Sequence, residues 1–436
     1  MRNAIFRLVT TIITSRTRRD IMRVLRGVRR RVTFARPVID YFHQADDPYS
    51  HLIAQLLPAL TERYGVVIRP WLVSPPDYSA APERDRLKAY ALRDAPRVAS
   101  QYGLDFPAGA VLPEAAAIEL ANRALAAALA GKTFAETAVQ VGAALFTSAL
   151  TQANAGALAD TAVTEQRLAA GDAERLRLRH YLGGMMNFEG EWYWGVDRLN
   201  HLEERLAGIG RDRKRGTPML APFRDMTLGP VPAGSPVMIE AWFSFRSPYS
   251  WIAFPRLRTL ARHYGATLKL RYILPMVMRG LPVPPMKTLY IALDTKREAE
   301  RVGLPYGTII DPVGKGAERC LAVLHKAVAL GKGEDFAELG MRAAFADGIA
   351  VATRSGLYDV ARRAGLTDAE TTAALADETW RVTAEENRAA LFDAGLWGAP
   401  TYRVNGGDAH WGQDRLWALE EDVIRAMGGK SSAGLS

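Results

Sequence analysis

Apolar and polar positions follow each other along the chain in an order that predicts the same strands and helices twice. Short apolar runs at 38–42 and 237–243 are typical of buried strands. Each run leads through a turn into a segment with helical spacing, such as residues 249–265, and a second strand is predicted at 266–274. Long helical segments follow, and residues 400–427 close the second half with strand-like residues, a turn and a helix. Each half is therefore predicted to form a mixed sheet whose parallel pair of strands is joined by a helical crossover.

The two halves match when the chain is compared with itself at an offset of 200 residues. The Pro-Tyr-Ser run at 48–50 recurs at 248–250, and further coincidences follow without a gap over more than 60 positions. Near the ends of the copies, WGVDR at 194–198 matches WGQDR at 411–415 at an offset of 217, so the second copy has 17 extra residues in its middle. A period of this length is too long for a solenoid unit and indicates a duplicated domain.

We predict copies at 37–207 and 237–430, joined by a linker at 208–236 that is rich in glycine, proline and charge. The 436 residues are too many for one ordinary core, and 48% hydrophobic with 24% charged residues is typical of a globular protein. A single cysteine, Cys320, excludes a disulfide framework and a CxxC redox pair. It stands in an apolar helical run and is predicted to be a core thiol, and we expect a cytoplasmic protein without a metal site.

The positive charge lies entirely in the N-terminal extension, residues 1–36. This segment has eleven arginines and one acid, a charge of +10, whereas the whole chain carries +9, so the rest carries −1. A body without basic excess argues against nucleic acid as a partner. Apolar residues of the extension have helical spacing: Ile5, Leu8, Val9, Ile12 and Ile13. Two interpretations stay open, a basic amphipathic helix in peripheral contact with an anionic membrane and an extension that packs on its own domain.

Three motifs of the second copy resemble those of a known family. Ser-Pro-Tyr-Ser at 247–250 opens a helix, Gly-Ala-Pro-Thr at 398–401 precedes a strand, and WGQDR at 411–415 opens the last helix. This order resembles the DsbA-like thioredoxin superfamily, and within it 2-hydroxychromene-2-carboxylate isomerases and kappa-class glutathione transferases. The resemblance implies an α/β fold with two tandem thioredoxin-like domains, each with a helical insertion, of which the first is degenerate.

Ser247 is the expected catalytic residue. Redox members of the superfamily have Cys-Pro-x-Cys at this helix start, where unpaired N–H groups and the helix dipole stabilise a thiolate. With Ser247 and Ser250 in place of the cysteines, the resemblance implies that the thiolate comes from bound glutathione and receives a hydrogen bond from the Ser247 hydroxyl. The simpler interpretation is that Ser247 only caps the helix.

The remaining motif residues are expected to bind glutathione. Pro400 matches the family's cis-proline, and Ala399 before it would pair with the cysteinyl backbone. Gln413 and Asp414 would meet the γ-glutamyl end, although the family usually has Ser or Asp at the position of Gln413. Lys287 matches a lysine near the family's active site and would hold a carboxylate of glutathione or substrate; it is equally a candidate for a solvated surface charge.

The first copy departs from the motifs. Asp47 stands where the second copy has Ser247, and its carboxylate would repel a thiolate. At the offset of 217, Gly183 stands opposite Pro400, and Val196 replaces the polar residue of WGQDR. We therefore expect a degenerate copy that serves as a structural partner, in a monomer with an internal pseudo-dimer or in a homodimer. The alternative is a different site built from Asp47 and His43.

One recurrent pair is predicted to be structural. Asp294 and Arg297 recur as Asp94 and Arg97 in the copy that has lost the motifs, which favours an ion pair at i, i+3.

The resemblance implies a glutathione-dependent isomerase of aromatic-compound catabolism, in which the thiolate adds reversibly to a hydroxychromene carboxylate. Two other functions are considered: a glutathione transferase acting on an electrophile at the same site, and a non-catalytic binding protein. A thiol-disulfide oxidoreductase is excluded, because neither copy has the cysteines.

Overall fold

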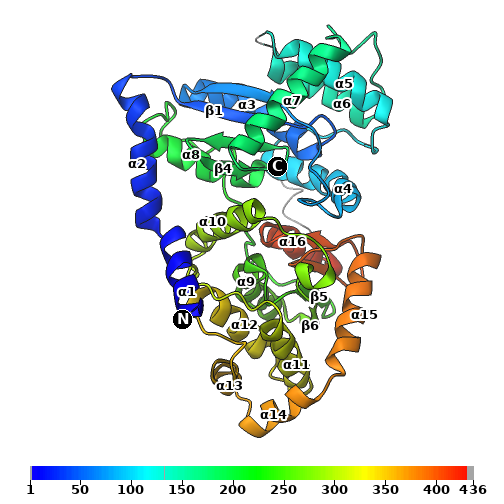
Figure 1. Cartoon of the computed structure of the whole chain (residues 1–436). Coiled ribbons are helices and arrows are strands. Elements are labelled where there is room, and N and C mark those ends of the chain that lie inside the picture. Colours follow the sequence, from blue (N-terminus) through cyan, green and yellow to red (C-terminus); the bar gives the residue numbers. More distant parts are fainter. Residues whose placement is uncertain (1, 132, 430–436) are drawn as a thin grey trace. The chain divides into compact units, whose positions relative to one another are not determined.

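The computed structural model describes residues 2–131 and 133–429 (Figure 1). Contacts divide the chain into two compact units. One unit, Ile21–Arg224, is called the first domain. The other unit, called the second domain, begins at Asp225 and also includes the residues that precede Ile21. The division between Arg224 and Asp225 falls inside the predicted linker. The N-terminal extension is not a unit of its own, because α1 (Arg2–Ile13) belongs to the second domain and most of α2 (Arg16–Val32) to the first.

The first domain is a four-stranded sheet with a helical insertion. The sheet has the order β2-β1-β3-β4, in which β1 and β2 are parallel and the other neighbours are antiparallel. Its elements are β1 (Val38–His43), α3 (Pro48–Tyr64), β2 (Val67–Leu72), α4 (Arg84–Tyr102), α5 (Ala115–Ala128), α6 (Phe134–Phe146), α7 (Thr161–Arg177), β3 (Met185–Phe188), β4 (Glu191–Trp194), η1 (Val196–Arg198) and α8 (Leu199–Gly208).

The second domain repeats this plan with a longer insertion. Its sheet has the order β6-β5-β7-β8 with the same strand directions, so the fold predicted from the sequence is confirmed. Its elements are β5 (Met238–Phe243), α9 (Pro248–Tyr264), β6 (Thr267–Tyr272), η2 (Met276–Arg279), α10 (Pro285–Arg301), α11 (Lys315–Ala329), α12 (Gly333–Arg342), η3 (Ala343–Asp347), α13 (Arg354–Arg363), α14 (Asp368–Ala376), α15 (Trp380–Asp393), β7 (Thr401–Val404), β8 (His410–Trp411), η4 (Gln413–Arg415) and α16 (Leu416–Ala426). Cys320 is buried in α11, as predicted, and burial raises the pKa of its thiol.

The recurrent Tyr-Gly pairs end α3 and α9, the helices that follow β1 and β5. Gly65 and Gly265 take left-handed conformations with φ of 59° and 62°, which close α3 and α9 at little steric cost. The strand that pairs parallel with β1 or β5 follows directly. This turn is why the Tyr-Gly pair recurs at the offset of 200.

A recurrent glutamate fixes the connecting segment to each domain from within. Glu203 is buried, accepts a hydrogen bond from the Tyr64 hydroxyl at 2.9 Å and binds the backbone N–H of Ala221. Glu420 does the same in the second domain, with the Tyr264 hydroxyl at 2.9 Å and the backbone N–H groups of 227 and 228. The segment predicted to be a linker is therefore bound to buried carboxylates over part of its length.

Strand pairing corrects the predicted alignment of the two copies. Ile39 pairs with Phe188, whereas its counterpart Ile239 pairs with Val404, so β3 and β7 correspond at an offset of 216. The offset reaches 217 only at β4 and β8, because the β7–β8 turn has one more residue than the β3–β4 turn. The residue opposite Pro400 is consequently Gly184, not Gly183. The backbone bonds agree: Gly195 N binds Gly184 O, and Gly412 N binds Pro400 O, both at 3.0 Å.

Candidate active site

The candidate site begins where β5 passes into α9. Ser247 is the N-cap of α9: its Oγ accepts a hydrogen bond from Ser250 N at 3.1 Å, and Pro248 occupies the first helical position. The capping role is thus present, but it uses only one lone pair of the hydroxyl. The hydroxyl proton is donated to the carbonyl oxygen of Ala399 at 2.9 Å. Ser247 is half-buried, whereas Ser250 is buried.

This hydrogen bond joins two motifs that are 152 residues apart in the chain. Ala399 and Pro400 lie just before β7, which pairs with β5, so the strand pairing brings them to the start of α9. The Ala399–Pro400 peptide bond is cis, as predicted. Gly412, at the start of the third motif, binds the carbonyl of Pro400, and the three motifs of the second domain therefore meet in one place.

The side chain of Gln413 is bound inside the domain. It is 1% exposed; its Nε2 donates to Glu298 at 2.6 Å and its Oε1 accepts from Arg256 at 2.9 Å. Arg256 also binds the Gln413 carbonyl and Asp225. With both ends of its amide engaged inside the domain, the Gln413 side chain holds η4 in position.

Asp414 has a different environment from its neighbour. Its side chain retains 19% exposure and lies 3.7 Å from Arg415 Nη1. It stands in η4, just before α16, where a carboxylate is favoured by the positive end of the helix. Solvent can therefore reach part of the Asp414 carboxylate.

Lys287 lies in the first turn of α10 and is half-buried. Burial lowers the pKa of its ammonium group to about 8. The group is therefore mostly charged near neutral pH and loses its charge more readily than an exposed lysine. This is the behaviour of a partly desolvated cation and differs from that of the solvated surface charge considered above.

The predicted ion pair of the second domain is confirmed. Arg297 Nη2 lies 2.8 Å from Asp294 Oδ1, and Asp294 is fully buried. The structure adds a third partner, because the Tyr249 hydroxyl donates to Asp294 Oδ2 at 2.8 Å. Its counterpart Tyr49 binds Asp94 at the same distance. The tyrosine of the Pro-Tyr-Ser run therefore connects α3 to α4 in the first domain and α9 to α10 in the second domain.

Sequence reasoning missed Arg246, which precedes Ser247. Its guanidinium binds both carboxylate oxygens of Asp311, with nitrogen–oxygen distances from 2.8 to 3.1 Å. The counterpart in the first domain is Asp46, whose partner is Lys88 at 2.7 Å. The sequence signal for Arg246 was that the repeat has an acid at this position in the first copy and an arginine in the second.

In the first domain the corresponding helix start is occupied by the protein's own carboxylate. Asp47 accepts hydrogen bonds from Tyr49 N at 3.3 Å, Ser50 N at 2.9 Å and Ser50 Oγ at 2.7 Å. Burial raises the pKa of Asp47 to about 6 despite these bonds. A Cβ at Gly184, whose φ is +59°, would lie 2.8 Å from Asp47 Oδ2. The lack of a side chain at Gly184 thus leaves room for the Asp47 carboxylate.

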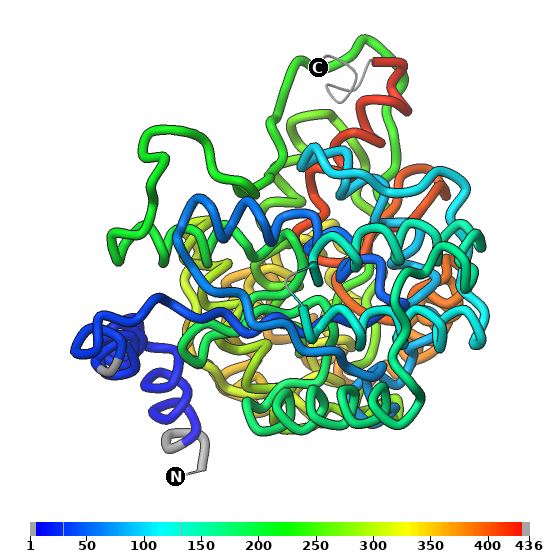
Figure 2. The backbone as a smooth tube through the Cα atoms, turned by 90° about the horizontal axis from the view of Figure 1, so that it is seen from above, coloured from blue at the N-terminus to red at the C-terminus, as the bar shows by residue number. Residues whose placement is uncertain are grey.

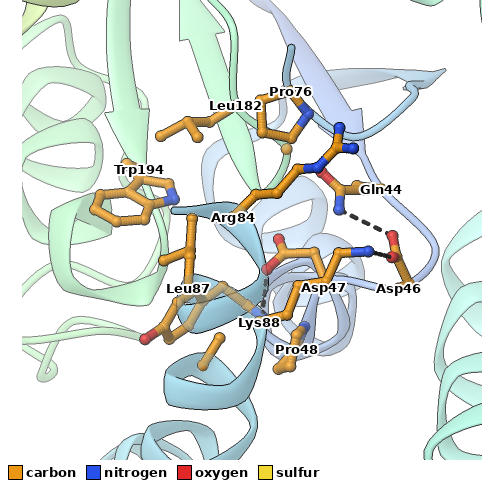
Figure 3. A pocket seen from close by; sticks show the side chains of 13 residues that line it. Gln44, Asp46, Asp47, Pro48, Pro76, Arg84, Leu87, Lys88, Leu182 and Trp194 are labelled. Carbon is orange, nitrogen blue, oxygen red and sulfur yellow. Dashed lines mark hydrogen bonds and ion pairs between the residues drawn. The ribbon is translucent and has the colours of Figure 1, made fainter. Parts of the chain in front are cut away.

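A pocket that is partly open to solvent lies beside Asp47 (Figure 3). Figure 3 shows Asp46 next to Gln44 and Lys88, with Trp194 on the opposite wall. His43 is not among the residues that line this pocket: it is buried, and its Nδ1 lies 2.8 Å from the Tyr41 hydroxyl. Burial lowers the pKa of His43 to about 3. His43 therefore does not line this pocket with Asp47.

Comparisons with known proteins identify one family model and several similar proteins. The family model of the DsbA-like thioredoxin domain matches residues 238–423. A 2-hydroxychromene-2-carboxylate isomerase of Pseudomonas sp. (strain C18) is 24% identical over 196 residues, which are 43% of this chain and 90% of that protein. The enzyme of the same name from Pseudomonas putida is 24% identical over 197 residues and is covered to 95%. A solved structure of a 2-hydroxychromene-2-carboxylate isomerase aligns with a TM-score of 0.37 and 24% identity, covering 46% of this chain and 99% of that one.

Proposed function

We propose that the second domain, a DsbA-like thioredoxin domain at residues 238–423, is a glutathione-dependent isomerase of the 2-hydroxychromene-2-carboxylate isomerase type. The observation that carries this function is the hydrogen bond between Ser247 and Ala399, at which the three motifs of the domain meet. The two curated relatives of that name, at 24% identity, support the same reaction class.

The donor groups at the start of α9 suit a thiolate. The first turn of α9 contains no acid, and its N-cap is a neutral hydroxyl. The positive end of the helix therefore faces no carboxylate from its own cap, in contrast to α3 with Asp47. A thiolate at this place would be stabilised as in other reactive thiol sites at helix starts.

Bound glutathione would supply the nucleophilic thiolate, which is recovered unchanged after the isomerisation. In this proposal Ser247 redirects its hydroxyl proton from Ala399 O to the sulfur and so lowers the pKa of the thiol. The backbone of Ala399 would bind the peptide part of glutathione, and the half-buried carboxylate of Asp414 would accept its ammonium group. Lys287 would hold a carboxylate of glutathione or of a small aromatic substrate while its own ammonium is charged. Gln413 would act only by positioning η4.

We expect one glutathione per chain, bound by the second domain. In the first domain the helix start is already neutralised by Asp47, and Gly184 stands in place of Pro400. We place the reaction in the cytoplasm, where thiols are kept reduced. A kappa-like transferase would use the same groups but would leave the substrate attached to the sulfur.

Calorimetry of glutathione binding, followed by chromatographic separation and mass spectrometry of the products of a hydroxychromene carboxylate, tests this function. We expect one binding event per chain and a new chromatographic species that has the mass of the substrate. A product heavier by one glutathione would instead identify a transferase. Binding of two molecules per chain would contradict the assignment of the first domain as degenerate, and absence of binding would contradict glutathione dependence.

A further inference from the structure

Helix α2 has its apolar side chains on the side that faces solvent. Five of them are between 45% and 72% exposed: Ile21, Val24, Leu25, Val28 and Val32. With about 100° of rotation per residue, these positions fall within an arc of about 100°, which we call the α2 stripe. In Figures 1 and 2 the outer side of α2, drawn in blue, is not covered by other described elements of the first domain.

The opposite side of α2 is attached to the protein by arginines. Arg23 makes two hydrogen bonds to Glu191, at 2.7 and 2.8 Å, and Arg30 binds Glu189 at 2.8 Å. Arg26 donates to the Glu189 carbonyl at 3.2 Å. These acids lie at the β3–β4 turn, and Gly27 is buried on the same side of the helix. The helix is thus bound to the first domain through charges.

This orientation is the reverse of that in an ordinary surface helix, which buries its apolar side and exposes its charges. If apolar burial held α2 in place, the stripe would face β3 and β4. An exposed apolar strip of this kind marks a surface that binds something else.

The charges beside the stripe indicate which occupant fits. Arg18 and Arg31 are exposed on its two flanks, and among the described residues neither is paired with an acid; their contacts are to the backbone carbonyls of Ile13 and Val24. A second copy of the same helix would bring arginines against arginines. A surface of acidic headgroups over an apolar layer matches both the stripe and its flanks.

We propose that the α2 stripe docks on an anionic lipid surface, with its apolar side chains at the boundary of headgroups and acyl chains and with Arg18 and Arg31 on lipid phosphates. The contact is peripheral: none of the described helices combines the length and apolar composition that a bilayer crossing needs. This association is independent of the reaction proposed for the second domain.

Flotation of the full chain with vesicles tests the docking surface. Wild type should float with vesicles of phosphatidylcholine and phosphatidylglycerol, far less with phosphatidylcholine alone, and less at high salt. The double variant Leu25→Ser/Val28→Ser should lose at least about tenfold in vesicle affinity, because two apolar side chains no longer enter the lipid. Each of Arg18→Gln and Arg31→Gln should lose about fivefold on anionic vesicles only.

The matched control is Leu176→Ser. Leu176 lies on α7 of the same domain and is 61% exposed, close to the 58% of Leu25, but it is outside the stripe. It should leave vesicle binding unchanged, and all variants should keep wild-type glutathione binding. The proposal is overturned if wild type does not float with anionic vesicles, or if Leu176→Ser loses as much as the stripe variant. It is equally overturned if sedimentation shows a dimer that Leu25→Ser dissociates while no vesicles are bound, since the stripe would then join two copies.

Discussion

Replacing Ser247 by alanine tests whether its hydroxyl lowers the pKa of the bound thiol or only caps α9. The side chain accepts one hydrogen bond from Ser250 N and donates one to Ala399 O. Loss of the cap should lower the free energy of unfolding by about 0.5–2 kcal/mol. Stability alone therefore says nothing about catalysis, and the informative quantity is the pKa of the bound thiol.

The expected size of the pKa change follows from one hydrogen bond. A hydroxyl that donates to a thiolate contributes about 1.5–3 kcal/mol in favour of the charged form, which corresponds to about 1–2 pKa units. Near neutral pH the thiolate fraction, and with it the turnover rate, should fall about 10- to 100-fold. The rate should partly recover at alkaline pH, because the thiol then ionises without help from Ser247.

The assay is the thiolate absorbance of bound glutathione against pH in wild type, Ser247→Ala and a matched control. Thr353→Ala is that control: Thr353 caps α13, accepts from Gly356 N at 3.1 Å and donates to Ala350 O at 2.8 Å. It should reproduce the loss of stability with an unchanged thiol pKa. Ser250→Ala should also change the thiol pKa little. Equal thiol pKa values in wild type and Ser247→Ala would refute the role of Ser247 and leave it as a cap.

Three further predictions concern the stability of the two domains. Asp47→Asn keeps a capping side chain but removes a carboxyl whose pKa is about 6. The folded state binds this proton more tightly than the unfolded state. As the pH rises from about 4 to about 6, the unfolding free energy of wild type should therefore fall by up to about 3 kcal/mol relative to that of the variant. Gly184→Ala should cost about 1–3 kcal/mol in the first domain, because φ is +59° and the new Cβ meets Asp47. Tyr249→Phe should cost about 1–3 kcal/mol in the second domain, since the buried Asp294 loses a donor.

Denaturant unfolding at several pH values, with hydrogen exchange to assign the domain, measures all three. A parallel pH dependence of wild type and Asp47→Asn would contradict the raised pKa. Wild-type stability of Gly184→Ala would show that the turn accommodates a side chain. For Tyr249→Phe, the combined variant with Asp294→Ala provides the double-mutant cycle, and additive losses would exclude the hydrogen bond.

The sequence was sufficient where the determinants are local or repeated. Short apolar runs and helical spacing, together with the offset of 200, predicted both sheets, and the family resemblance of the three motifs implied a common site for Ser247, Ala399 and Pro400. The hydrogen bonds of the Gln413 side chain could not be predicted, because its partners, Glu298 and Arg256, are 115 and 157 residues away and nothing in WGQDR reveals them.

Two other features depend on information that a pattern does not contain. Gly184 was missed as the counterpart of Pro400 because a single extra residue in the β7–β8 turn is visible only in the strand pairing. The orientation of α2 could not be decided from the sequence, because helical periodicity identifies an apolar side without telling whether it faces the domain. Here the acids Glu189 and Glu191, far along the chain, decide the orientation by binding the arginines.

The close fit of Asp47 and Gly184 has an evolutionary consequence. A return of the first domain to the arrangement of the second requires Asp47→Ser and Gly184→Pro. Proline cannot adopt the φ of +59° at position 184, and its Cβ would meet the Asp47 carboxylate. Serine alone would leave the space of that carboxylate unfilled beside a glycine turn. Each single step is penalised while the other residue is unchanged, so these two positions resist conversion to the arrangement of the second domain.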